Sequence, residues 1–458
     1  MPNTQEPKQE GTSGVKRNKR RPRLKVTTGG RGVVNHAGAR LLADLADATG
    51  LTGALSAAMA PTKQRRRGHD RGEVLADLAV MIADGGETIS DLAVLRDQPN
   101  LFGEVASHAT AWRTLEAVDD AALERIKTAR AQARAAAWAA GADPGAYVID
   151  IDATLVGSHS DKQGAAPTYK RGFGFHPLCS YLDATGEALA GLLRPGNAGS
   201  GTAADHVVVL DDSLDQLPVD PHDVDVIART DSAGCSHGFL DACRDRQVRF
   251  VVGHALTVEI AQVLVGLPQR RWQPAITADG SDYRDEAEVA EITDLVDLTG
   301  WPEGTRMIAR REDPHPGAQL TFTDLDGHRY QVCITDLADD DIAYLEALYR
   351  GRGRAERRIC DAKDTGLANL PSWSFAINHA WLQLTLIAMD LFAWSGALVL
   401  DDDLVRAEPK RLRYCLLHTA GQIVRSSRQH RLRLADTWPW AGQLVASFER
   451  LHNLPLQV

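Results

Sequence analysis

The sequence predicts an α/β protein in which a mixed sheet is flanked by helices. Three segments have strand character and are joined by hairpin-like links, at 146–152, 173–182 and 187–193. A strand, a helix and another strand are then predicted at 223–231, 238–245 and 248–252. Hairpin links give antiparallel neighbours and a strand–helix–strand unit gives parallel ones, so the sheet should contain both.

The length and the charge distribution limit the possible classes of protein. A chain of 458 residues is long enough for two or three units with substantial cores. The formal net charge of −10 argues against a protein coated all over by nucleic acid. However, residues 1–40 carry ten Lys and Arg against two Glu, and 406–433 carry eight against one. Basic regions on an acidic body are typical of a protein that binds a polyanion at chosen places.

The sequence favours a cytoplasmic protein without a membrane span. Its six cysteines form no CxxC pair, which indicates reduced thiols and neither a zinc site nor a disulfide framework. No apolar signal segment follows the start. The longest apolar run, 376–400, is interrupted by His379 and Asp390, so it is predicted to be a buried core helix.

Residues 1–32 form a basic arm that is expected to be disordered until it meets a partner. Its cations include Arg20 and Arg21. Two interpretations are open: a tail that keeps the protein soluble, or an arm that grips phosphates.

Residues 33–145 have apolar side chains at helical spacing and are predicted to be a helical region. After a break at Pro99, Ser107 is a good N-cap for a short helix that carries Arg113. Two short helices around a turn permit a helix-turn-helix that reads a DNA groove, although simply packed helices have the same pattern.

The second half contains a predicted β-rich insertion at 266–338, with strands at 305–311, 319–323 and 329–334 and a hairpin turn at Asp326–Gly327. Helix is expected again from 339 to 400, and residues 401–458 form a basic C-terminal region.

Carboxylates follow two of the predicted strands. Asp152 and Asp231 both lie at the C-terminal ends of strands, where open α/β sheets place their ligands. Glu356 comes from a later helix that could cross beside those ends. Three converging carboxylates repel one another unless cations neutralise them, and ligation by oxygen alone favours Mg²⁺ or Mn²⁺. Two such ions would clamp the attacking and leaving oxygens of an in-line phosphoryl displacement.

The stretch 349–363 surrounds Glu356 with basic side chains. Tyr349, Arg352, Glu356 and Lys363 fall within roughly 60° of one another on an ideal helix. A solvated helix with an Arg352–Glu356 pair is the plain interpretation. Gly351 and Gly353 each cost about 1 kcal/mol in a helix interior. The helix is therefore predicted to begin near Arg354, with Tyr349 and Arg352 on a loop.

Taken together, these residues give the chain a resemblance to the DDE transposases of bacterial insertion sequences. It resembles the cut-and-paste class with a Y-(2)-R-(3)-E-(6)-K signature, which Tyr349, Arg352, Glu356 and Lys363 match at every spacing. Asp152-Ala153-Thr154 is similar to the context of the first acid, and Asp231-Ser232 to that of the second. The resemblance covers about residues 150–394.

The resemblance implies an RNase H-like fold in two parts, 146–265 and 339–400, around the β-strand insertion. It implies Mg²⁺-dependent cleavage of DNA at the element's ends, with transfer of the 3′-OH into target DNA. Asp152, Asp231 and Glu356 would hold two metal ions, while Tyr349, Arg352 and Lys363 would position phosphates. Double-stranded DNA would be the partner, bound by a homodimer on paired ends of the element in the bacterial nucleoid, with Arg20, Arg21 and Arg113 as further contacts.

Three alternatives stay open. The chain could be another RNase H-like nuclease or integrase, which would hydrolyse DNA without the same strand transfer. It could be a domesticated transposase descendant that only binds DNA. Within the site, Asp150 precedes Asp152 by two residues on the same strand face, so it could share or take over metal binding.

Overall fold

The computed structural model describes residues 25, 27–63, 68–199, 201–314, 324–426 and 429–455. Arg20, Arg21 and nearly all of the predicted basic arm lie outside the described residues, as does the predicted strand 319–323.

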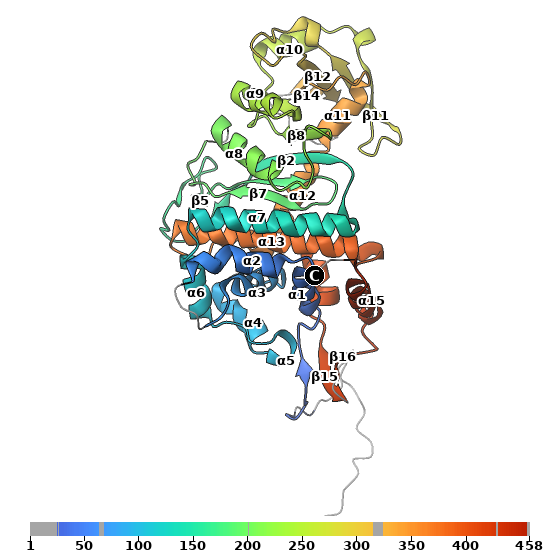
Figure 1. Cartoon of the computed structure of the whole chain (residues 1–458). Coiled ribbons are helices and arrows are strands. Elements are labelled where there is room, and N and C mark those ends of the chain that lie inside the picture. The colour runs from blue at the N-terminus through green and yellow to red at the C-terminus, as the bar shows by residue number, and fades with distance from the viewer. Residues whose placement is uncertain are drawn as a thin grey trace, which may run out of the picture.

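A mixed sheet of ten strands organises one half of the molecule (Figure 1). Its order is β10-β11-β12-β14-β9-β8-β2-β6-β7, with β13 paired to β14. β2 is antiparallel to β6 and parallel to β8, and β8 is parallel to β9, so the predicted mixed α/β sheet is confirmed. The five strands on the β7 side are β2 (Tyr147–Ala153), β6 (Leu178–Leu182), β7 (Ala188–Leu192), β8 (Val226–Thr230) and β9 (Arg249–His254).

The inserted segment continues this same sheet. β14 pairs antiparallel with β9, and β12, β11 and β10 follow outward. α10, which the sequence pattern did not predict, leads into the insertion. The elements here are α10 (Val258–Val265), β10 (Gln273–Ile276), β11 (Tyr283–Glu291), β12 (Arg306–Glu312), β13 (Asp324–Leu325), β14 (His328–Thr335) and α11 (Ile342–Arg350).

One expected strand is divided in two. The run 173–182 forms β5 (Phe173–Phe175) and β6, with His176 and Pro177 between them. Proline has no N–H to donate to a sheet ladder, which explains the interruption. β5 instead joins β3 (Val156–Gly157) and β4 (Ala166–Pro167) in a separate small sheet.

Helices cover both faces of the sheet. α8 (Ala203–Leu214) packs against β6 and β7, and α9 (His237–Asp245) packs against α8 and β9. α13 (Phe375–Leu398) crosses β7 and also contacts α7 (Asp120–Ala137), and the two helices run side by side across the molecule (Figure 1). In the described part of the chain, α13 is the one helix with the length and apolarity of a membrane span. Its apolar window is 83% buried, which confirms the predicted core helix.

A charged network inside the core joins α7, α13 and β7. Arg130 and Arg134 of α7 both donate to Asp390 of α13, at 2.9 and 2.8 Å. Arg134 also donates to Glu187, 3.0 Å away and just before β7. All four side chains are at most 1% exposed. The network holds two cations and two anions, so its buried charges balance.

The N-terminal helices lie on the other side of α13 and share its core. Asp70 caps α3 by accepting from Gly72 and Glu73, and Ser107 caps α6 as its sequence position predicted. The helices are α1 (Ala39–Ala48), α2 (Leu51–Met59), α3 (Arg71–Ala83), α4 (Ala93–Arg96), α5 (Pro99–Phe102) and α6 (His108–Glu116).

The C-terminal region returns to the N-terminal one. β1 (Val33–Val34) pairs with β15 (Gly421–Ser426), which pairs with β16 (Gln429–Leu434). This three-stranded sheet projects from the helical body (Figure 1). α14 (Pro409–Leu412) precedes it, and α15 (Ala441–His452) packs against α1.

Candidate active site at the ends of two parallel strands

Asp152 and Asp231 lie side by side at the carboxyl ends of β2 and β8. The last aligned pair of these parallel strands is Ile151 and Thr230, and each acid is the next residue along its strand. Neighbouring strands are about 4.8 Å apart, so the ladder brings the two acids to the same edge of the sheet. Each carboxylate accepts a local backbone N–H, from Ala153 at 2.8 Å and from Ala233 at 2.9 Å.

Glu356 comes to this edge from α12 (Gly353–Ala362), which packs against β2. Arg352 lies between the acids: its Nη1 is 3.7 Å from Asp152 Oδ2, and its Nη2 is 3.6 Å from Glu356 Oε1. The Asp152 side chain is 14% exposed, whereas that of Glu356 is 68% exposed. Glu356 therefore forms the i,i+4 ion pair with Arg352 that the plain interpretation predicts, and it also lies near the carboxyl ends of β2 and β8.

The electrostatics of this edge favour a bound cation. The pKa of Asp152 is raised to about 6, mainly by burial and also by the negative charge of Asp231, while Arg352 opposes the shift. Glu356 also contributes to the rise. A buried carboxylate near two others is costly to ionise, and a bound cation would stabilise its ionised form. The oxygen donors fit Mg²⁺ or Mn²⁺ better than a softer metal.

Tyr349 lies at the end of α11, which corrects the expectation that it sits on a loop. Its ring packs over β9: a Cβ at Gly253 would be 2.3 Å from Tyr349 Oη and 3.0 Å from the amide N of Ser232. Burial is the main cause that raises the pKa of Tyr349 to about 12, so the phenol stays protonated. The phenol thus lies next to the residue that follows Asp231.

Arg352 is the N-cap of α12, and the backbone between Tyr349 and Arg354 makes tight turns in the helical region. Two consecutive helices therefore replace the single ideal helix. The expected start near Arg354 is close to the observed one, because the glycines at 351 and 353 weaken a continuous helix. Lys363 caps the other end of α12, two turns beyond Glu356 on the same face.

Asp150 has a different partner. Both of its oxygens accept hydrogen bonds from Arg229, from Nε at 2.6 Å and from Nη2 at 2.8 Å. Arg229 also lies 3.0 Å from Asp183 and donates to the carbonyl of Leu348 at 2.6 Å. Burial raises the pKa of Asp150 to about 6 and Arg229 opposes that shift. The carboxylate of Asp150, which could have competed with Asp152 for a metal ion, is therefore already paired with Arg229.

The sequence contains a signal for this ion pair that the predictions above did not use. Asp150 and Arg229 each stand two residues before a predicted site acid, and the strand register aligns them directly. A buried acid and base at equivalent positions of parallel strands are expected to pair. Arg354 of α12 adds to this network by donating to Asp183.

Arg113 lies away from this edge. It is on α6, exposed, and donates to Thr110 at 3.2 Å. α6 packs on α3 and α13, on the far side of the α7 and α13 pair from β2 and β8 (Figure 1). The structure brings Asp152, Asp231, Glu356, Arg352 and Tyr349 together and leaves Arg113 on another part of the surface.

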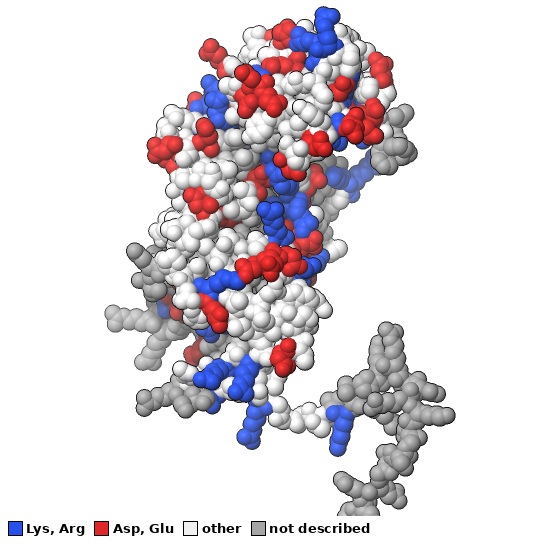
Figure 2. All heavy atoms as spheres, turned by 90° about the vertical axis from the view of Figure 1, so that its right-hand side faces the viewer, with Lys and Arg blue, Asp and Glu red and all other residues white. Residues whose placement is uncertain are grey.

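Basic and acidic side chains gather together in a band across the middle of the face drawn in Figure 2. Several cations of α12 and α14 are paired: Arg357 lies 2.7 Å from Glu408, and Lys410 lies 2.7 Å from Asp364. These cations remain about half exposed or more, so a polyanion could still reach them.

A family model and a solved structure are similar to this chain. Residues 16–456 match the family model of the transposase DDE domain, group 1. No curated protein matches the chain. Among solved structures, the cryo-EM structure of a piggyBac transposase synaptic complex with hairpin DNA is similar, with 11% identity and a TM-score of 0.42. The match covers 85% of this chain and 81% of that one.

Proposed function

Since the chain belongs to the family of the transposase DDE domain, group 1, we propose that it cuts DNA at the ends of a bacterial insertion sequence and joins the freed 3′-OH to target DNA. The observation that carries this proposal is the meeting of Asp152 and Asp231 at adjacent parallel strand ends, with Arg352 linking Asp152 to Glu356. Phosphodiester chemistry needs concentrated negative charge that can hold cations beside a bound backbone.

The strand arrangement supports an RNase H-like core for this reaction. Three antiparallel strands, β7, β6 and β2, are followed by the parallel β8 and β9. The candidate acids stand at the centre of that order, on β2 and after β8, and the third arrives on a later helix. The β-rich insertion lies between the second and third acids in sequence and extends the sheet beyond β9.

Asp152, Asp231 and Glu356 would hold two Mg²⁺ or Mn²⁺ ions, which when bound stabilise charge on the attacking and leaving oxygens. Arg352 partly offsets the negative charges of Asp152 and Glu356 in the free protein and is placed to contact a phosphate of the bound strand. Tyr349 keeps its proton and can donate it in a hydrogen bond to a phosphate oxygen. Lys363 extends this phosphate contact along the face of α12.

DNA would be held by surfaces beyond this edge. Arg20, Arg21 and Arg113 are proposed contacts to the element's terminal repeats, and the exposed arginines of β15 and β16 offer another. Such contacts release counterions and orient the duplex. Cut-and-paste transposition brings two ends together, so a homodimer on paired ends is part of the proposal.

The test is incubation of the full chain with linear DNA that bears the element's own ends, with Mg²⁺, followed by mapping of the products. Asp152→Asn, Asp231→Asn and Glu356→Gln should each abolish cleavage while leaving binding to the ends largely unchanged. Asp225→Asn is the matched control, because Asp225 is exposed and precedes β8 at its opposite end. It should cleave like the unaltered chain.

Two outcomes would contradict the proposal. Cleavage without any joined product would favour a nuclease of the same fold. Specific binding to the ends with no cleavage in Mg²⁺ or Mn²⁺ would favour a descendant that only binds DNA.

A further inference from the structure

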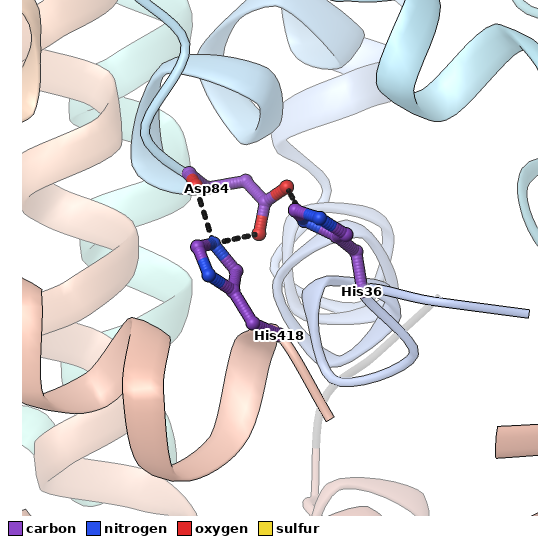
Figure 3. A group of neighbouring side chains, drawn as sticks. All are labelled: His36, Asp84 and His418. Carbon is purple, nitrogen blue, oxygen red and sulfur yellow. Dashed lines mark hydrogen bonds and ion pairs between the residues drawn. The ribbon is translucent and has the colours of Figure 1, made fainter. Parts of the chain in front are cut away.

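Three side chains from distant parts of the sequence meet around the carboxylate of Asp84 (Figure 3). His36 lies between β1 and α1, Asp84 is the C-cap of α3, and His418 lies just before β15. His36 Nδ1 is 2.5 Å from Asp84 Oδ2, and His418 Nε2 is 3.4 Å from Asp84 Oδ1. The imidazole rings are 4.3 Å apart between centroids.

We propose that His36, Asp84 and His418 form a binding site for one divalent transition-metal ion of the zinc class. One ligand atom from each of the three lies within 4.8 Å of the others. Zinc binds imidazole nitrogen and carboxylate oxygen at about 2.0–2.2 Å, so tetrahedral ligand atoms stand about 3.3 Å apart. Small side-chain movements reach that geometry from the observed one. Three protein ligands leave the fourth position for water.

The burial of Asp84 supports a bound cation independently of this spacing. Asp84 is 5% exposed, and its buried Oδ1 makes no hydrogen bond among the described residues; its ion-pair contact is His418 Nε2 at 3.4 Å, which also lies 2.9 Å from the backbone carbonyl oxygen of Asp84. A buried carboxylate oxygen that accepts no hydrogen bond is costly, and a metal ion would give it a direct contact. Figure 3 shows both imidazoles turned toward this carboxylate.

Arg413 is a further cation near Asp84, and its contacts leave the carboxylate available. Its guanidinium donates to the carbonyls of Ala83 and Asp364, at 2.7 Å each. No hydrogen bond from Arg413 to the Asp84 carboxylate occurs among the described residues. The negative charge of Asp84 can therefore attract a metal ion.

The site differs in chemistry from the edge with Asp152, Asp231 and Glu356. Two imidazoles and one carboxylate favour zinc, cobalt or nickel, whereas three carboxylates favour Mg²⁺ or Mn²⁺. The metal ties the base of the sheet β1-β15-β16 to the end of α3, because His36 follows β1 closely and His418 closely precedes β15. It thereby fixes the orientation of a sheet that carries exposed arginines, Arg425, Arg431 and Arg433.

The experiment strips the full chain with a chelator and titrates Zn²⁺ by calorimetry, with thermal unfolding measured in parallel. We expect one tight site per chain and a higher thermal midpoint with Zn²⁺. His36→Ala and His418→Ala should each weaken that binding by at least about ten-fold and remove the thermal shift. His430→Ala is the matched control, since His430 is exposed on β16 and should leave binding unchanged.

Two further measurements distinguish this site from the candidate active site, and distinguish lost metal binding from misfolding of a variant. Asp152→Asn should retain the tight Zn²⁺ site. Co²⁺ in the unaltered chain should give an absorption spectrum of four-coordinate geometry with imidazole ligands, a readout that needs no variant. The proposal is overturned if the unaltered chain shows no stoichiometric Zn²⁺ site, or if the site survives both histidine substitutions.

Discussion

Arg229 and Asp150 form a fork-to-fork ion pair across two parallel strands, two residues before the candidate metal ligands. The Arg229 Nε and Nη2 atoms lie 2.6 and 2.8 Å from the two Asp150 oxygens, and both side chains are almost fully buried. The pair aligns β2 with β8 immediately below Asp152 and Asp231. Asp150 and Asp152, which lie on the same strand, therefore have different roles: Asp150 is part of a structural ion pair, and Asp152 is available to a ligand.

The first prediction concerns this division. Asp150→Ala leaves the buried Arg229 guanidinium without its main partner, and should lower the free energy of unfolding by about 3–5 kcal/mol. Asp152→Ala should change stability far less, because the contacts of Asp152 are weaker: Arg352 at 3.7 Å and the adjacent backbone N–H of Ala153. Urea unfolding of both variants measures the difference. Equal losses of stability would show that Asp150 is no more structural than Asp152.

The second prediction concerns the buried network between α7, α13 and β7. Asp390→Ala leaves Arg130 and Arg134 facing one remaining carboxylate, that of Glu187, and should cost about 3–5 kcal/mol. Asp241→Ala, on the exposed side of α9, is the control and should stay within about 0.5 kcal/mol. A small effect of Asp390→Ala on chemical denaturation would mean that water or a rearranged partner replaces the lost carboxylate.

The third prediction tests the contact of Tyr349 with β9. In Gly253→Ala the new methyl would lie 2.3 Å from Tyr349 Oη, so the ring must move, at about 1–3 kcal/mol. Tyr349→Phe removes that oxygen and should recover part of the loss in the double variant. Gly157→Ala serves as the control, since nothing lies within 4 Å of its added Cβ. Purely additive effects in thermal unfolding would exclude the contact.

The fourth prediction is a pH dependence at α3. The pKa of Asp77 is raised to about 7, mainly by burial and also by the negative charges of Glu73 and Asp47. Between about pH 4 and 7 the folded protein keeps a proton that the unfolded chain has lost, so the contribution of Asp77 to stability falls as pH rises through this window.

Asp77→Asn should therefore match the unaltered chain near pH 4 and exceed it at pH 8, by on the order of 2 kcal/mol after allowance for partial solvent contact. Urea unfolding at both pH values measures this. Glu73→Gln should move the pH dependence caused by Asp77 toward lower pH, because it removes a negative charge near Asp77. A constant difference between Asp77→Asn and the unaltered chain at all pH values would show that Asp77 does not titrate in this range.

Local patterns in the sequence determined the individual elements with good accuracy. The β-branched run before Asp152, the strand before Asp231 and the apolar run of α13 were all predicted near their observed positions. Strand alternation, capping side chains and helical spacing act over a few residues, so one segment is enough to show them. α10 and the outer strands β10 and β11 were missed: α10 and β10 are short, with eight and four residues, and the nine residues of β11 include several charged side chains.

Only the tertiary structure decided which distant residues became partners. Arg229 meets Asp150 across 79 positions, Arg130 meets Asp390 across 260, and His418 meets Asp84 across 334. Strand register and helix packing fix these meetings, and both depend on how the whole core closes. The sequence by itself determined which side chains stand at strand ends and helix starts. The folded chain decided that Asp150 belongs to Arg229 and that Asp152 faces Arg352, because a buried charge takes the partner that packing brings to it.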